Sequence, residues 1–181
     1  MGRRPISEGH VIYVSTSKVI ELTGLSAVVL REWTRRRALI PADIPAAGKG
    51  NAAKFSWRTV LIIRIANQLK EEFHLQLQAH APQFSELREV LSEHSFLALY
   101  GTAIVCSPSE PWRLSRADEF GPTCAFLKLP LHDHLEAICG AFGKASPRTR
   151  SQQFDLFPAT EIRTMRVDFE RSGRDVGRRQ A

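Results

Sequence analysis

The chain has 181 residues, of which 43% are hydrophobic, and a formal net charge of +6. This length allows one medium domain or two small ones, and the apolar fraction is sufficient for a packed core. No apolar run approaches the roughly 20 residues of a membrane span, and the basic N-terminus lacks the apolar stretch of a signal peptide. Three cysteines without close pairs do not form a disulfide framework. We therefore expect a soluble protein of a reducing cytoplasm.

The charge is unevenly distributed along the chain. Residues 1–75 hold 12 Lys/Arg against 6 Asp/Glu, residues 76–143 hold 4 against 8, and residues 144–181 hold 9 against 5. A basic first part beside an acidic middle part predicts a polyanionic partner for the first part. An uneven but merely solvated surface is the alternative that charge alone leaves open.

The first elements are predicted from caps and turns. Residues 1–10 indicate a mobile arm, and the β-branched and aromatic residues 11–14 favour a short strand. A hydroxyl of residues 15–17, Ser17 among them, can cap a following helix. Gly24 ends this helix, because glycine tolerates the left-handed conformation that closes a helical turn. Ser26 then caps a second helix.

The second helix is apolar on one side and cationic on the other. Leu30 and Trp33 are three residues apart and share a face that can dock on the core. The opposite face carries Val28, Arg31, Glu32 and Arg35, and Arg36 follows directly. A helix of this kind can pack on its own domain and present arginines to base edges and phosphates. Pro41 is predicted to stop it.

A basic loop and a long helix come next. Residues 42–54 include two glycines, with Lys49 between them and Lys54 after them, which favours a two-stranded wing with a basic tip on the DNA backbone. Ser56 is predicted to cap a helix from residue 57 to about residue 73. Arg58 lies in its first turn, where a cation opposes the helix dipole, so we interpret it as a phosphate contact.

Residues 11–80 together resemble the MerR family of transcription regulators. The resemblance is carried by Val-Ile-Glu-Leu-Thr-Gly-Leu-Ser (residues 19–26), the Arg31 and Trp33 pair, the Leu-Ile-Pro exit (residues 39–41), the glycine-containing wing, and Leu-Lys-Glu-Glu-Phe-His-Leu (residues 69–75). It implies a winged helix-turn-helix that binds palindromic promoter DNA as a homodimer. By this resemblance Arg31 is the DNA-facing arginine, Glu32 replaces an aromatic residue, and Lys54-Phe55 replaces an Arg-Tyr pair. The residues expected at the DNA are Ser17, Ser26, Val28, Arg31, Glu32, Arg35, Arg36, Lys49, Lys54 and Arg58.

The remaining chain predicts an α+β module and a tail. Residues 81–95 favour a connector helix that covers the first domain or begins a dimer interface. Residues 96–143 favour a small α+β module with its own core: strand segments over 96–106 and 123–129, a loop over 107–121, and a helix over 131–142 opened by Pro130. This module would sense an effector or hold two protomers together. Residues 144–181 indicate a basic, mostly disordered tail.

The side chains with catalytic or metal-binding chemistry do not form a recognisable motif. Cys106, Cys124, His132, His134 and Cys139 lack the close ligand pairs of zinc sites, and the cysteines lie in apolar runs. No nucleophile motif or paired carboxylate motif is present. We therefore expect no enzymatic activity, no metal and no cofactor.

The sequence thus predicts an α+β protein that binds double-stranded DNA as a transcription regulator. Two alternatives remain open at this point. One is an architectural DNA-binding protein of the excisionase type, and the other is a protein-interaction module that works through residues 96–142.

Overall fold

The computed structural model describes residues 11–48, 51–107, 110–119, 125–144 and 146. The predicted arm over residues 1–10, the wing tip with Lys49, and the tail beyond residue 146 lie outside this part of the chain. Its helices are α1 (Thr16–Thr23), α2 (Ala27–Arg31), α3 (Trp57–Glu71), α4 (Ala81–Ser92) and α5 (His132–Cys139), with short turns η1 (Glu32–Arg36), η2 (Leu77–His80), η3 (Leu97–Leu99) and η4 (Gly140–Phe142). Its strands are β1 (Val14–Ser15), β2 (Lys54–Phe55), β3 (Thr102–Cys106), β4 (Arg113–Arg116) and β5 (Leu127–Pro130).

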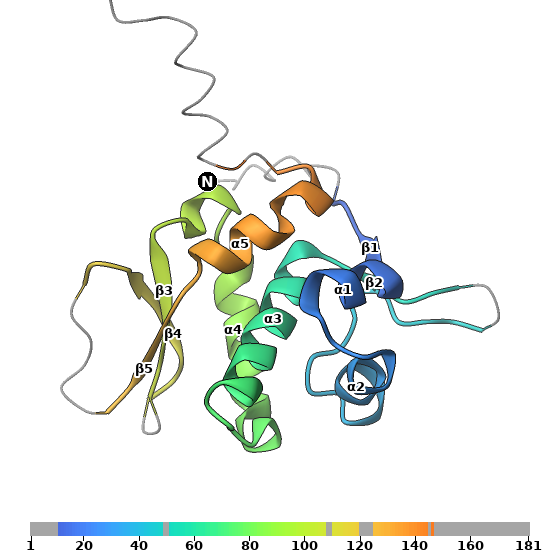
Figure 1. Cartoon of the computed structure of the whole chain (residues 1–181), viewed down its shortest axis with the longest axis horizontal. Helices are drawn as coiled ribbons and strands as arrows, with labels where there is room; N and C mark the ends of the chain where they lie inside the picture. Colours follow the sequence, from blue (N-terminus) through green and yellow to red (C-terminus); the bar gives the residue numbers. More distant parts are fainter. Residues whose placement is uncertain (1–10, 49–50, 108–109, 120–124, 145, 147–181) are drawn as a thin grey trace, which may run out of the picture.

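The protein is a mixed α+β structure in which α3 and α4 lie at the centre (Figure 1). Helices α1 and α2 lie on one side of them, with β1 and β2, and the three-stranded sheet lies on the other side. Helix α5 crosses above α3 and packs on it. Within the described residues, no helix is long and apolar enough to cross a membrane.

The predicted caps and turn between α1 and α2 are confirmed. The Ser15 hydroxyl accepts from the Lys18 backbone N–H at 3.5 Å, and Gly24 ends the helix with a φ of 71°. The Ser26 hydroxyl accepts from the Val29 N–H at 3.3 Å and so caps α2. These local contacts fix where both helices begin and where the first one ends.

The end of α2 differs from the prediction. The helix widens into a π-turn over η1, in which the Arg37 N–H donates to the Glu32 carbonyl at 2.9 Å. Ala38 then adopts a left-handed conformation with a φ of 48°, three residues before Pro41. This reversal lets the next two residues, Leu39 and Ile40, turn back into the core, where both are buried.

The predicted strand over residues 11–14 is shorter than expected. Only β1 pairs with β2, in the antiparallel register Val14 to Phe55 and Ser15 to Lys54. Ile44 forms a further antiparallel bridge to Lys54 from the other side, with both backbone hydrogen bonds present. In the described part of the loop this bridge is the strand pairing present, so the predicted two-stranded wing over residues 42–54 is reduced to it.

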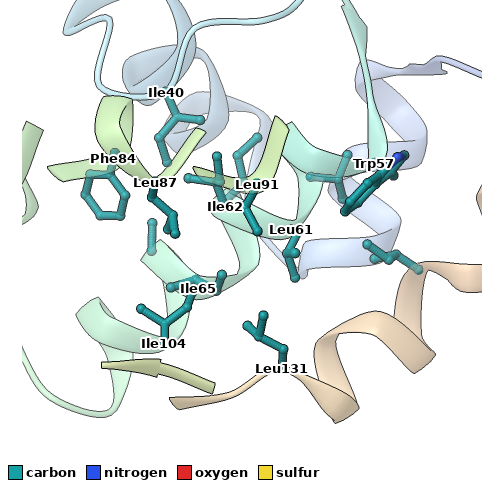
Figure 2. Packing of buried hydrophobic residues seen from close by; sticks show 14 of the residues in the cluster. Ile40, Trp57, Leu61, Ile62, Ile65, Phe84, Leu87, Leu91, Ile104 and Leu131 are labelled. Atoms are coloured by element: carbon teal, nitrogen blue, oxygen red, sulfur yellow. The ribbon is translucent and has the colours of Figure 1, made fainter. Parts of the chain in front are cut away.

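Helix α3 begins at the predicted Ser56 cap and is buried on nearly every side. Its residues Val60 to Ile63, Ile65, Ala66 and Leu69 are all inaccessible to solvent, and Figure 2 shows several of them between α4, α5 and the sheet. The predicted extension to Phe73 is wrong. His74 has a φ of 53°, and the Leu75 N–H bonds back to the Leu69 carbonyl at 3.1 Å, which closes the helix and leaves Phe73 39% exposed.

Helix α4 packs across α3 with Phe84, Leu87 and Leu91 buried, so it covers the first domain, which was the first of its two predicted roles. Pro82 does not break this helix, because it lies in the first turn, where a missing N–H has no cost. The helix also contacts strand β4.

The second sheet has the strand order β4-β3-β5, and both pairings are antiparallel. Three predictions for this region are wrong in part. Residues 97–99 form a 3-10 turn and not a strand, and the predicted loop over 107–121 contains β4. Pro130 ends β5 and pairs with Ala103, and α5 begins two residues later. A proline is tolerated there because β5 is an edge strand.

Residues 96–142 do not have a separate core. Buried side chains from Val14 to Phe142 belong to one continuous cluster, with Ile104 of β3 and Leu131 close to Ile65 and Leu61 of α3 (Figure 2). The two predicted units therefore share their apolar surface.

The left-handed Ala38 makes a test of this turn possible. A residue with a Cβ is strained in this conformation, whereas glycine is not. We expect Ala38→Gly to raise the free energy of unfolding by about 0.5–1 kcal/mol, measured by urea titration. Ala137→Gly, at an exposed position inside α5, should lower it by about 1 kcal/mol. Equal destabilisation by the two substitutions would contradict the left-handed turn.

Candidate nucleic-acid interface

Helix α2 and the π-turn η1 that continues it form one helical segment, which is docked by its inner face. Leu30 and Trp33 are buried, as predicted, and α2 contacts α1. On the outer face Val28 is 75% exposed, and Arg31 and Arg35 are exposed as well. The helix therefore presents an apolar group and two guanidinium groups to solvent.

Glu32 divides the arginines of this helix into two pairs. Its carboxylate accepts from Arg37 Nε at 2.8 Å and lies 3.5 Å from a terminal guanidinium nitrogen of Arg36. The hydrogen bond from Arg37, together with the two positive charges, holds the pKa of Glu32 below its usual range. In the described structure, neither Arg31 nor Arg35 has an ion pair. These two arginines are thus the cations that α2 and η1 can offer to a partner.

A groove of about 390 Å³ separates α2 from the loop over residues 42–53. Arg31 and Arg35 line it on the helix side, and its opposite wall consists of small apolar side chains. The wall and floor residues include Pro41, Ala42, Pro45, Ala46, Ala52, Ala53 and Phe55. A cationic rim above an apolar floor is a surface on which a sugar–phosphate chain can lie, with phosphates at the arginines and sugars on the floor.

The other expected contact residues are placed differently. The Ser17 hydroxyl lies 2.8 Å from that of Ser15, and the hydroxyl of Ser26 serves as the α2 cap. Lys54 is exposed but lines a separate depression with Tyr13 and Ile44, outside the groove beside α2. Among the expected residues that the structure describes, Val28, Arg31 and Arg35 lie together on one accessible surface.

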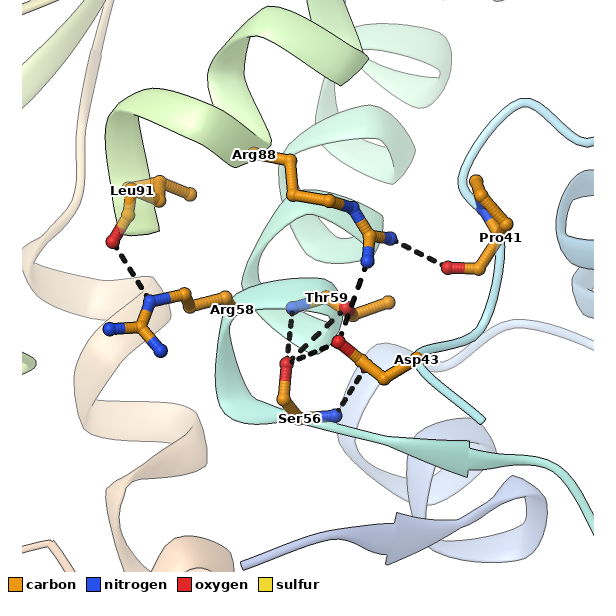
Figure 3. A network of polar contacts seen from close by, with 7 residues as sticks. All are labelled: Pro41, Asp43, Ser56, Arg58, Thr59, Arg88 and Leu91. Carbon is orange, nitrogen blue, oxygen red and sulfur yellow. Dashed lines mark hydrogen bonds and ion pairs between the residues drawn. The ribbon is translucent and has the colours of Figure 1, made fainter. Parts of the chain in front are cut away.

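Arg58 has an intramolecular role. Its Nε donates to the Leu91 carbonyl at 2.9 Å (Figure 3), and a terminal nitrogen donates to the His94 carbonyl at 3.2 Å. The guanidinium also lies 4.5 Å from the ring centroid of Trp57. Burial lowers the pKa of Arg58 somewhat, although carbonyl oxygens at the end of α4 satisfy its donors. The expected phosphate contact is replaced by a cap on α4, so Arg58 is not part of the candidate interface.

A polar network that the sequence did not indicate fixes the base of the loop. Asp43 accepts from the Ser56 N–H at 2.7 Å and from the Ser56 hydroxyl at 3.0 Å (Figure 3). Arg88 of α4 reaches Asp43 at 3.4 Å and donates to the Pro41 carbonyl at 2.6 Å. The start of α3, the base of the loop and α4 are thereby held together by charge-assisted hydrogen bonds.

Two side chains of α3 hold the end of α1 in the same way. Arg64 donates to the Leu22 carbonyl, and the Asn67 amide donates to the Thr23 carbonyl at 3.4 Å. These carbonyls precede Gly24 and have no partner within α1. The turn into α2 is therefore positioned from α3.

The cysteines and histidines do not converge. Cys106 is buried in β3, where burial raises the pKa of its thiol to about 12, and Cys139 donates to the Glu136 carbonyl at 3.1 Å. His132 packs edge-on against Tyr100, and Cys124 lies outside the described residues. No group of three potential ligands close enough to hold a metal ion occurs in the part of the chain that the structure describes.

The chain matches no protein-family model, and no curated protein is significantly similar to it. What the surface of α2 does is therefore inferred from its geometry and chemistry.

The ion pairs of Glu32 with Arg36 and Arg37, here called the Glu32 clamp, lead to the first prediction for this surface. Glu32→Gln removes one negative charge and releases Arg36 and Arg37 from ion pairing. If the surface meets a polyanion, we expect tighter binding of the full chain to duplex DNA and a steeper fall of affinity with salt. Fluorescence anisotropy at several salt concentrations measures both quantities. The matched variant Glu119→Gln removes the same charge from the turn after β4 and should leave both unchanged. An equal gain in the two variants would contradict a local effect of Glu32.

His134 leads to a prediction on pH. It is buried between α5 and α3, and its Nε2 lies 2.9 Å from the Gln68 side-chain oxygen. Burial, and then the positive charge of Arg64, lower the pKa of His134 to about 4. The unfolded chain, with an ordinary histidine pKa near 6.5, takes up the proton first, so stability is lost as the pH falls from about 6.5 towards 4.

This loss should reach about 1.4 kcal/mol per pH unit within that window. Urea unfolding at pH 7, 6 and 5 measures it. We expect His134→Gln to flatten this part of the pH dependence and His132→Gln, on the same helix, to retain it. The same slope in His134→Gln as in the wild-type protein would contradict a buried neutral imidazole.

Proposed function

We propose that the chain is a sequence-specific, DNA-binding transcriptional regulator whose residues 11–80 act as a winged helix-turn-helix of the MerR type. Helix α2 would enter the major groove, and the loop over residues 42–53 would lie as a wing on the sugar–phosphate backbone. The proposal includes a cytoplasmic homodimer that needs no cofactor and has no enzymatic activity.

The observation that carries the proposal is the two-sided placement of the helical segment formed by α2 and η1. Its inner side chains Leu30 and Trp33 are buried, so the helix cannot rotate without losing core contacts. Its outer side chains Arg31 and Arg35 are exposed and lack ion pairs in the described structure. A rigid helix with unpaired arginines is suited to the major groove, because an arginine can donate two hydrogen bonds to guanine or contact a phosphate.

The preceding elements support the same reading. Three residues, with Leu25 buried at the centre, join α1 to α2, which is the connection length of helix-turn-helix units. Both arginines also line the groove between α2 and the loop, where a sugar–phosphate backbone would lie. The Asp43–Ser56–Arg88 network holds the base of the loop against the start of α3 and against α4.

The dimer interface would be formed by residues beyond 80, because the proposal uses α2 and the wing for contact with DNA. An excisionase-like architectural protein would use the same surface of α2. Genome-wide mapping of bound sites separates the two, because a regulator should occupy promoters and an architectural factor should occupy recombination sites.

The test of DNA binding uses the full chain and duplexes that it selects in vitro from a random pool. We expect a selected motif and a linear fall of log affinity with log salt, with a slope of about −0.9 per phosphate contacted. Arg31→Ala should weaken binding by about 5- to 150-fold and blur discrimination at one base pair.

Arg113→Ala is the matched control, because it removes the same charge from an exposed position on β4, on the far side of the molecule from α2 (Figure 1). It should bind as the wild-type protein does. Equal losses in Arg31→Ala and Arg113→Ala, or the absence of any selected motif in a folded protein, would contradict the proposal.

A further inference from the structure

The most exposed of the large hydrophobic side chains in the described structure is Val28, at 75%. It lies in the first turn of α2, two residues after the Ser26 cap, and Arg31 follows it by three residues. Residues three apart on a helix are neighbours on its surface, so Val28 and Arg31 form one patch. An apolar group is thus held out to solvent beside a cation that has no ion pair in this part of the chain.

The fold does not need this side chain to be apolar. The adjacent Val29 is half-buried and packs against the core, and Leu30 completes the inner face. Val28 contributes to neither contact, and a polar residue at this position would keep the helix equally well. An exposed valine beside arginines is suited to a partner that offers an apolar group next to negative charge.

Val28 is also well suited to a fixed contact. A β-branched side chain in a helix has one strongly preferred χ1 rotamer, so its two methyl groups have a nearly fixed position. The first turn of the second helix is the part that reaches base edges in helix-turn-helix complexes. Arg31 would contact a neighbouring base pair, and Arg35 would supply positive charge for a flanking phosphate.

Resting on the DNA-binding function proposed above, we infer that Val28 reads the 5-methyl group of a thymine in the major groove. Thymine is the unmodified base that presents a methyl group there, and an apolar side chain can contact it but cannot hydrogen-bond to the other base edges. The rise between Val28 and Arg31 is about 4.5 Å, against about 3.4 Å per base pair. The thymine should therefore lie one or two base pairs from the pair that Arg31 contacts.

The experiment removes the 5-methyl group of thymine and, separately, the two methyl groups of Val28. In the duplex selected in vitro by the full chain, each thymine is replaced in turn by deoxyuridine, which lacks the 5-methyl group and keeps the base pairing. We expect one replacement to weaken wild-type binding by about fourfold, the equivalent of one buried methyl group. Val28→Ala should lose a similar factor on the thymine duplex and little more on the deoxyuridine duplex.

Val11→Ala, at another exposed valine, serves as the control and should show the full deoxyuridine effect. If every deoxyuridine replacement affects the wild-type protein and Val28→Ala alike, the thymine contact of Val28 is overturned. DNA binding itself would stand in that case, because Arg31→Ala reports on it separately. If the wild-type protein selects no duplex, both the DNA-binding function and the thymine contact fail.

Discussion

The burial of α3 is the constraint on which the other elements depend. Its apolar residues contact α1, α4, α5 and β2, so each of these elements covers part of the same helix. A helix that is apolar nearly all round is stable in water only when it is enclosed. The elements before and after α3 in the chain must therefore fold around it, which explains why one core includes residues from both halves.

The polar residues of α3 also act outwards, on the ends of its neighbours. Arg58 caps the last carbonyls of α4, while Arg64 and Asn67 hold the last carbonyls of α1. Carbonyl groups at helix ends need donors when water is excluded, and α3 supplies these donors from within the core. As a result α1, and with it the turn into α2, has a fixed position. The exposed side chains of α2 therefore do not have to hold the helix in place. Glu32 differs from them, because it pairs with Arg36 and Arg37.

The sequence predicted interactions between residues that are close together in the chain, and it did not predict those between residues that are far apart. The caps Ser15, Ser26 and Ser56 and the Gly24 turn depend on residues within four positions, and they were predicted. The roles of Arg58, Asp43 and Arg88 depend on partners more than ten residues away, and only the folded chain reveals them. Strand β4 was missed because its pairing with β3, and not its polar sequence, makes it a strand. Of the expected DNA contacts, those with exposed side chains on α2 were brought together, since helical periodicity alone determines that face.

The central claim is that the outer face of α2 and the adjoining loop form the surface that meets DNA. Hydrogen–deuterium exchange of the full chain, with and without its selected duplex, tests this directly. The account predicts added protection in peptides that cover residues 26–37 and 42–56, and no change in peptides that cover β4 and β5. Protection confined to residues 96–142, with α2 unchanged, would contradict it.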